Sequence, residues 1–243
     1  MFLYTAIEKK YTFSLVDEKK NTSYDTFILV KTNKEGVGMS QEVLEIIKKM
    51  DLETLESQLV LQCAPVLAGI KISNLLSLPK SMKRILKRFM QKLNLSYFVL
   101  LENDKKIVVL LYRKRALECY LKNEQVQNFL ERMGYTEANL EVLLSILAER
   151  YEKHMSKKGE FPHEMGLFLG YPMEDVEGFI ENDGKNFLCT GYWKVYKNKQ
   201  EKTALFRQYE QAKEWMILFV SNGVDVIEAA QILSQGQLYS ICL

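Results

Sequence analysis

The sequence predicts an α+β fold that is predominantly helical and contains a small, mostly antiparallel sheet. Apolar residues recur at helical spacing through most of the chain, and short β-rich runs are separated by polar turns. Hydrophobic residues make up 47% of the 243 residues and charged residues 26%, which is typical of a folded globular protein. We expect a main domain over residues 39–243, preceded by a hairpin-like extension over residues 1–38.

β-rich runs place the expected strands. Alternating apolar residues at 11–15 and a run at 27–30 flank a polar turn and predict the N-terminal hairpin. Two central runs, Ser96–Leu101 and Ile107–Tyr112, flank a polar connection of hairpin length, and the aromatic segment Gly191–Tyr196 is a further strand. We expect these last three strands to form one sheet, to which the N-terminal hairpin could add.

Helical spacing and capping residues place the helices around these strands. The expected helices are one that begins at Ser40, a buried one within Leu52–Leu78 that breaks or restarts at Pro65, Ser81–Leu93, Glu124–Met133, Glu137–Lys153, two short ones that begin near Pro162 and Pro172, Lys199–Val220, and Val226–Leu233. Most of the main domain is therefore expected to be helical.

Bulk properties argue against several classes of protein. The formal net charge is +2, so the whole chain has no bias towards nucleic acid or an anionic membrane. No apolar stretch reaches the roughly 20 residues that span a bilayer, and the N-terminus lacks a secretory pattern. The four cysteines form no C-x-x-C pair and there are two histidines, which disfavours a metal site or a disulfide scaffold. We expect a cytoplasmic protein with reduced thiols.

Two regions carry residue strings that are long enough to be specific. They are CAPVLAGIK at Cys63–Lys71 with Asn74 following, and FPHEMGLFLGYP at Phe161–Pro172 leading into EDVEGFIEN at Glu174–Asn182, Cys189 and GYWKVY at Gly191–Tyr196. Together they resemble an uncharacterised bacterial family that is catalogued only as a domain of unknown function, over roughly residues 55–209. The resemblance implies kinship and a bacterial, cytoplasmic origin, but no activity.

His163 and Glu164 are candidate catalytic residues at the start of a short helix. An imidazole and a carboxylate in a first helical turn can serve acid-base chemistry or ligand binding. The alternative is structural, with Glu164 stabilising the helix start and His163 making a hydrogen bond. A zinc-hydrolase motif is excluded, because Leu167 stands where H-E-x-x-H requires its second histidine.

Cys63 is a candidate nucleophile. A helix that restarts near Pro65 would lower the pKa of the thiol, and His163 could serve as its base. The alternative is that Cys63 is a small buried residue of an apolar helix. Lys71 and Asn74, which complete the same motif, are candidate ligand-binding residues.

The helix around Lys80–Lys92 is the most basic segment of the chain. It contains six basic residues and no acidic one, and we expect Lys83, Arg84, Lys87 and Arg88 to bind a ligand. The occupant could be an acidic protein surface, a phosphate-bearing cofactor or RNA. Alternatively, the face is simply solvated and balanced by the acidic helix at Glu174–Asp183.

Two further segments are candidate binding elements. Met165–Asn182 has the helix and turn spacing of a helix-turn-helix motif. Its second helix, however, is acidic and contains no basic residue, which disfavours DNA binding. Tyr192, Trp193 and Lys194 could present aromatic rings to a flat ligand such as a flavin or haem, although aromatic alternation in a strand is also typical of core packing.

These observations favour a cytoplasmic binding or accessory protein for an anionic small molecule, a cofactor or an acidic redox partner, which would use the basic helix and the His163 turn. Binding features are present, whereas no complete catalytic constellation is. Two alternatives stay open: a cysteine-dependent enzyme that uses Cys63 and His163, and a structural protein that forms oligomers. No particular cofactor is indicated.

Overall fold

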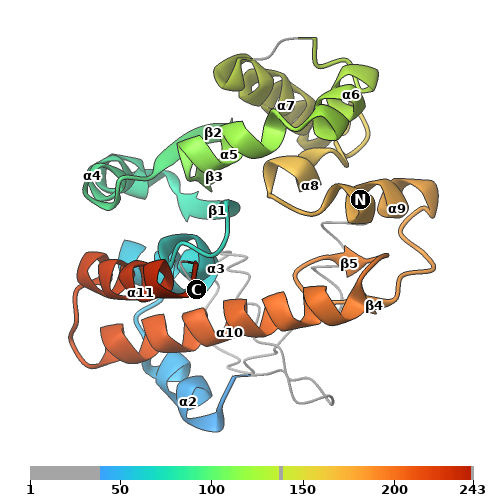
Figure 1. The fold of residues 1–243 in the computed structure, drawn as a ribbon. Helices are drawn as coiled ribbons and strands as arrows, with labels where there is room; N and C mark the ends of the chain where they lie inside the picture. Colours follow the sequence, from blue (N-terminus) through green and yellow to red (C-terminus); the bar gives the residue numbers. More distant parts are fainter. Residues whose placement is uncertain (1–38, 137–138, 242–243) are drawn as a thin grey trace, which may run out of the picture.

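The computed structural model describes residues 39–136 and 139–241, with side chains described as far as residue 235. The predicted N-terminal hairpin and Cys242 lie outside these residues. Helices predominate and the strands form two small antiparallel sheets, so the predicted α+β class is confirmed (Figure 1). Within the described ranges, no helix is both long and apolar enough to cross a membrane.

The predicted helices occur in the expected order, but the helix at Lys114–Leu121 was not predicted and the last helix, expected at Val226–Leu233, continues to Ile241. Their bounds are α2 Gln41–Lys49, α3 Leu55–Leu67, the 3-10 turn η1 Lys80–Met82, α4 Lys83–Leu93, α5 Lys114–Leu121, α6 Glu124–Arg132, α7 Leu140–Met155, α8 Met165–Phe168, α9 Met173–Glu181, α10 Lys199–Ser221 and α11 Val226–Ile241. Predicted signals mark several ends: the Ser40 hydroxyl caps α2, and Gly134 and Gly223 follow α6 and α10 with positive φ.

The main sheet contains β1 Ser73–Pro79, β2 Ser96–Glu102 and β3 Lys106–Tyr112 in the order β1-β3-β2, all antiparallel. The central hairpin of β2 and β3 is confirmed. The third strand, however, is β1, which lies in a run expected to be helical. Short apolar runs such as SNLLSLP do not separate strand from helix, and here pairing along the edge of β3 decides.

The aromatic segment near Tyr192 was expected in the same sheet, and that expectation is wrong. It forms a separate hairpin in which β4, Cys189–Thr190, pairs with β5, Lys194–Val195. The two strands hold only two residues each, so this hairpin depends on side-chain contacts with its neighbours.

The predicted break at Pro65 is also wrong. Helix α3 continues through Pro65 and ends two residues later, because Gly69 takes a φ of +86°. The carbonyl of Pro65 then accepts hydrogen bonds from the backbone N–H groups of Ile70 and Lys71, both at 3.0 Å. This turn folds the chain back beneath α3 and fixes the position of Lys71.

Strand β3 separates two hydrophobic cores. Its residues alternate between them: Val108, Leu110 and Tyr112 face the core built by α5 to α8, whereas Ile107, Val109 and Leu111 face the core built by α2, α3, α4 and α11. Helix α10 contributes to both cores, and Figure 1 shows it running from the β4–β5 hairpin to α11. The Cys63 motif and the Phe161 motif therefore belong to different cores joined by β3 and α10.

Candidate functional site

Lys71 is a buried amine at the centre of the CAPVLAGIK motif. Only 4% of the residue is exposed, and its Nζ donates a hydrogen bond to Asn74 Oδ1 at 2.5 Å. The Asn74 amide donates in turn to the carbonyl of Gln62 at 2.8 Å, which anchors it to α3. Lys71 Nζ also lies 5.5 Å from the centre of the Tyr171 ring. No carboxylate among the described residues lies within ion-pair distance of this amine.

Burial dominates the protonation of Lys71 and its neighbour Cys63. It lowers the pKa of Lys71 to about 7 and raises the pKa of Cys63 to about 12. Each group moves the other's pKa the opposite way, but by less than burial does. At neutral pH, Cys63 is therefore a protonated thiol while a large share of Lys71 is uncharged.

The structure does not bring Cys63 and His163 together. Cys63 is fully buried in the core on the α3 side of the sheet, and its polar neighbours are Lys71 and Asn74. It also lies nine residues into α3, far from the helix start that would activate a thiol. No contact joins Cys63 to His163 in the part of the chain that the structure describes, so the geometry gives this catalytic pair no support.

Glu164 is occupied by a buried ion pair. Its Oε1 accepts from Arg150 Nε at 2.9 Å and from the Tyr135 hydroxyl at 2.9 Å. It makes no capping hydrogen bond to α8. The two contacts hold α7 and the segment that follows α6 against the Phe161 motif, which is a structural arrangement different from the expected cap.

His163 lines a small cleft with Tyr171, Phe179, Trp193 and Lys194. Its ring packs between Phe161 and Phe179, with centroid distances of 5.6 and 5.2 Å. Nδ1 is buried without a hydrogen-bond partner among the described residues, and burial lowers the pKa of the imidazole. The predicted candidates His163, Trp193 and Lys194 thus meet, whereas Lys71 reaches the cleft only through its contact with the Tyr171 ring.

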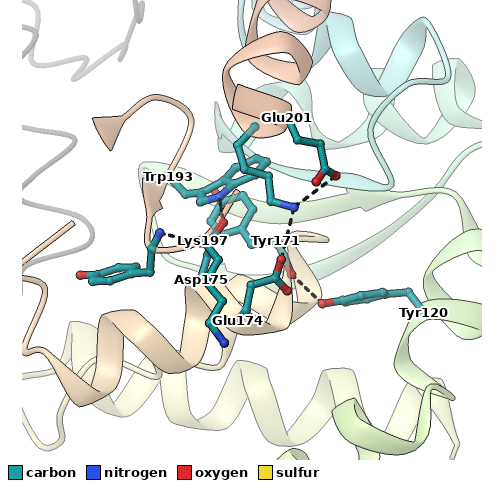
Figure 2. A network of polar contacts seen from close by, with 9 residues as sticks. Tyr120, Tyr171, Glu174, Asp175, Trp193, Lys197 and Glu201 are labelled. Atoms are coloured by element: carbon teal, nitrogen blue, oxygen red, sulfur yellow. Dashed lines mark hydrogen bonds and ion pairs between the residues drawn. The ribbon is translucent and has the colours of Figure 1, made fainter. Parts of the chain in front are cut away.

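Trp193 is held by a carboxylate that sequence reasoning missed. Trp193 Nε1 donates to Asp175 Oδ2 at 2.7 Å, and the backbone N–H groups of Tyr196 and Lys197 donate to Oδ1 at 2.7 and 3.2 Å (Figure 2). The Trp193 ring stacks on Tyr171 at 4.7 Å and is 5% exposed, so it offers no open platform for a flat ligand. In the sequence, Asp175 is one of several acidic residues of a helix expected to face solvent, so nothing in the local sequence indicated that it is buried.

A second set of polar contacts surrounds the same motif. Buried Lys202 on α10 forms ion pairs with Glu174 at 3.3 Å and with Glu201 at 3.4 Å. The Tyr120 hydroxyl on α5 donates to the carbonyl of Tyr171 at 2.6 Å (Figure 2). These contacts tie α5, α9 and α10 together. Tyr192 is likewise packed, against Phe206 and Tyr209. The Phe161 motif is therefore built chiefly as a joint between elements.

Helix α4 exposes the predicted basic surface. Lys80 and Lys83 form ion pairs with Glu102, but the remaining four cations have no ion pair or hydrogen bond within the described part of the chain. These four cations are Arg84, Lys87, Arg88 and Lys92, and we call their surface the α4 face. The acidic helix α9 does not cover it: α4 and α9 lie on opposite sides of the molecule in Figure 1, and Glu174 and Glu177 pair with Lys202 and Arg132.

The basic helix and the His163 turn therefore do not form one site. His163 lines a cleft with residues of α8 and α9, and Figure 1 shows these two helices on the side of the molecule away from α4. Within residues 39–136 and 139–241, no group of three or more His, Cys, Asp or Glu side chains is arranged to hold a metal ion. The described part of the chain therefore contains three separate candidate functional sites, which are the α4 face, the His163 cleft and the buried Lys71.

Comparison with known proteins identifies the family. A family model described as "Protein of unknown function (DUF3793)" matches residues 59–230, which is more than half of the chain. No curated protein and no solved structure matches the sequence. The matched range includes both motifs that carried the resemblance, the Cys63 motif and the Phe161 motif. The chain therefore belongs to the DUF3793 family.

Proposed function

We propose that this chain is a cytoplasmic binding protein whose α4 face docks on an acidic surface of a protein partner. The observation that supports it is the set of four exposed cations without an acidic partner among the described residues. The whole chain is nearly neutral, with 33 basic and 31 acidic residues. A local excess of one sign steers a partner of the opposite sign and fixes its orientation.

The α4 face has the geometry of a continuous stripe. Arg84, Arg88 and Lys92 recur every four residues, which places them on one side of the helix over about 12 Å. Lys87 extends the stripe sideways. The opposite side of α4 is anchored, because Leu86 and Met90 are buried in the core. A rigid helix holds the cations in place before binding, which reduces the entropy lost on association.

An apolar side chain beside the cations favours a protein over a nucleic acid. Ile85 is 48% exposed and lies three residues from Arg88, with the half-buried Phe89 one turn further. Protein interfaces combine an apolar centre with a polar rim, whereas a phosphate backbone would engage the cations and leave Ile85 in water. The combination fits an acidic protein surface with an apolar residue at its centre.

Charge reversal tests the proposal. We expect the double variant Lys87→Glu/Lys92→Glu to bind a fluorescent poly-L-glutamate probe about tenfold more weakly than the unaltered chain at low salt, measured by fluorescence anisotropy. Lys114→Glu/Lys199→Glu is the matched control, because it removes the same charge from exposed positions at the starts of α5 and α10. The control should retain the affinity of the unaltered chain.

Two results would count against the docking surface. Equal weakening in both double variants would mean that net charge, and not the α4 face, attracts the probe. Tighter binding of a single-stranded RNA of the same charge than of poly-L-glutamate would favour the nucleic-acid alternative. An Ile85→Ser variant supplies a further check. Removal of this apolar contact should weaken binding to an acidic protein surface but not to poly-L-glutamate, which has no apolar side chain.

A further inference from the structure

Lys71 differs from another buried lysine of the same protein. Lys202 is as deeply buried, but its ammonium forms ion pairs with Glu174 and Glu201. Among residues 39–136 and 139–241, the one hydrogen-bond acceptor of Lys71 is the neutral amide oxygen of Asn74, and its Nζ lies over the Tyr171 ring. A buried ammonium without a counter-charge is costly, so this environment favours the uncharged amine. The uncharged amine is the nucleophilic form.

We propose that Lys71 is the reactive amine of a site for a small aldehyde or ketone, with which it forms an imine. The inference rests on the Lys71 surroundings alone and does not depend on the α4 face. It accounts for a lysine that the fold buries beside a neutral acceptor, where an apolar residue would pack at lower cost. It also assigns a role to the CAPVLAGIK motif, which docking on α4 does not use.

The chemistry balances without a further reactant. The lone pair of Lys71 Nζ attacks the carbonyl carbon and forms the C–N bond, while the carbonyl π electrons move to oxygen and take up a proton. The resulting carbinolamine then expels its oxygen as water, which carries both protons of the neutral amine, and a C=N bond remains. Neither oxidant nor metal takes part. The reaction requires only that the amine starts uncharged and that the carbonyl can reach it.

The neighbours of Lys71 suit this reaction. Asn74 accepts one N–H and so orients the nitrogen, and its own amide is fixed by the carbonyl of Gln62. The Cys63 thiol is held in its protonated form by burial, so it does not compete as a nucleophile. Gly69 and Ile70 precede Lys71 in the chain and are exposed and half-buried, so the backbone next to this buried residue reaches the surface. The carbonyl compound must therefore be small.

An ammonium that holds an anion is the competing interpretation of the same residue. It would require Lys71 to stay charged at neutral pH, and a charged amine does not attack a carbonyl. The two interpretations therefore differ in reactivity and in its pH dependence. That difference can be measured on the full chain without knowing the natural ligand.

Reductive alkylation with acetaldehyde and sodium cyanoborohydride provides the test. The folded chain is treated at pH 7 with less than one equivalent of acetaldehyde, and ethylated lysines are located by peptide mass spectrometry. We expect Lys71 to be ethylated about tenfold faster than Lys202, because the Nζ of Lys202 is held in ion pairs with Glu174 and Glu201, whereas Lys71 has only a neutral acceptor among the described residues. The rate at Lys71 should rise to half its plateau near pH 7.

The controls separate folding from reactivity. In guanidinium-unfolded chain, Lys71 and Lys202 should react alike, because the burial that distinguishes them is gone. In Lys71→Met, the adduct should vanish from that peptide while ethylation of Lys202 is unchanged. If Lys71 in the folded chain reacts no faster than Lys202 at pH 7, or if its half-maximal rate lies above pH 9, the proposal is overturned. The measurement on the unaltered chain decides even if Lys71→Met does not fold.

Discussion

At the residue scale, Lys71 shows how backbone hydrogen bonds can direct an ionisable side chain into the core, where its charged form is unfavourable. The carbonyl of Pro65 accepts from the N–H of Lys71, so the turn after α3 directs this residue into the core. Its side chain then loses its hydration and gains one neutral acceptor. Burial therefore disfavours the protonated amine of Lys71, and the pH dependence of the free energy of unfolding measures this effect.

The free energy of unfolding should rise between pH 7 and pH 9 through Lys71. The pKa of Lys71 is about 7 in the folded chain and that of an ordinary lysine when unfolded, so in this window the unfolded chain binds one more proton. Stability then increases with pH by at most about 1.4 kcal/mol per pH unit. Above pH 9 the raised pKa of Cys63 acts in the opposite direction, because the unfolded thiol ionises first.

Urea denaturation of the unaltered chain and of Lys71→Met at pH 7, 8 and 9 measures this effect. The variant should lose the slope between pH 7 and pH 9, whatever its absolute stability. A matched variant, Lys202→Met, should keep the slope, because it removes a lysine of similar burial and leaves Lys71 and Asn74 in place. An identical slope in the unaltered chain and in Lys71→Met would show that this amine stays charged in the folded state.

Sequence reasoning could name Lys71 but not its environment. The motif singled out Lys71 and Asn74, and the structure joins them by a hydrogen bond. A lysine is ordinarily exposed, and its burial depends on the pairing of β1 with β3, which the local sequence does not encode. For the same reason the pairing of Glu164 with Arg150 and of Asp175 with Trp193 had no local signal.

At the element scale, the short hairpin of β4 and β5 depends on how closely α9 packs against it. Gly178 on α9 faces Tyr196, and a Cβ at position 178 would lie 2.6 Å from Tyr196 Cγ and 2.7 Å from Tyr196 Cβ. Tyr196 cannot withdraw easily, because its backbone N–H donates to Asp175. Both residues therefore hold Tyr196 against α9: Asp175 accepts its backbone N–H, and Gly178 leaves room for its side chain.

Gly178→Ala should destabilise the protein by about 1–3 kcal/mol, although alanine is the better helix former by about 1 kcal/mol. The clash involves atoms near the tyrosine backbone, so rotation of the ring does not relieve it. Thermal unfolding followed by circular dichroism gives the change. Gly159→Ala is the control, because a Cβ there meets nothing closer than 3.5 Å, and it should leave the melting temperature unchanged. A Gly178→Ala variant that melts higher would contradict the close contact.

Elements with strong periodicity could be predicted, and short ones could not. The spacing of apolar residues and the caps at Ser40 and Asn222-Gly223 gave α2, α4, α7 and α10 close to their observed bounds. β1 was missed, because an apolar run of seven residues fits a strand or a buried helix. The partner of the Tyr192 strand was misjudged for a different reason: strand pairing depends on contacts that are distant in sequence.

At the scale of the whole molecule, β3 and α10 join the two cores. α10 places Phe206 and Tyr209 in the core of the Phe161 motif, and Met216 and Ile217 in the core of the Cys63 motif. A helix of 23 residues that packs on both cores should make them unfold together. A substitution that weakens packing in one core should then destabilise the other core as well.

Leu59→Ala should lower the free energy of unfolding by about 2–5 kcal/mol. The decrease should be the same whether unfolding is followed by a probe in one core or in the other. Leu59 is fully buried on α3, whereas Trp193 lies in the other core. In a Trp215→Phe background, urea titration followed by Trp193 fluorescence and by circular dichroism should give coincident, equally shifted transitions. Leu144→Ala, a matched deletion in the core of Trp193, should behave in the same way. A Trp193 transition that stays in place with Leu59→Ala would mean that the cores unfold separately.

The two-sided burial of β3 leaves its alignment to a short loop. Because both faces of the strand are apolar, sliding it by one residue would still bury apolar side chains, so polarity does not reject the wrong alignment. The connection to β2 supplies the missing constraint: Asn103 Oδ1 accepts from the backbone N–H groups of Lys105 and Lys106, both at 2.9 Å. Asn103 therefore helps to set the register of β3 against β2, and a residue inserted after it should favour an alignment in which the side chains of β3 point to the opposite cores.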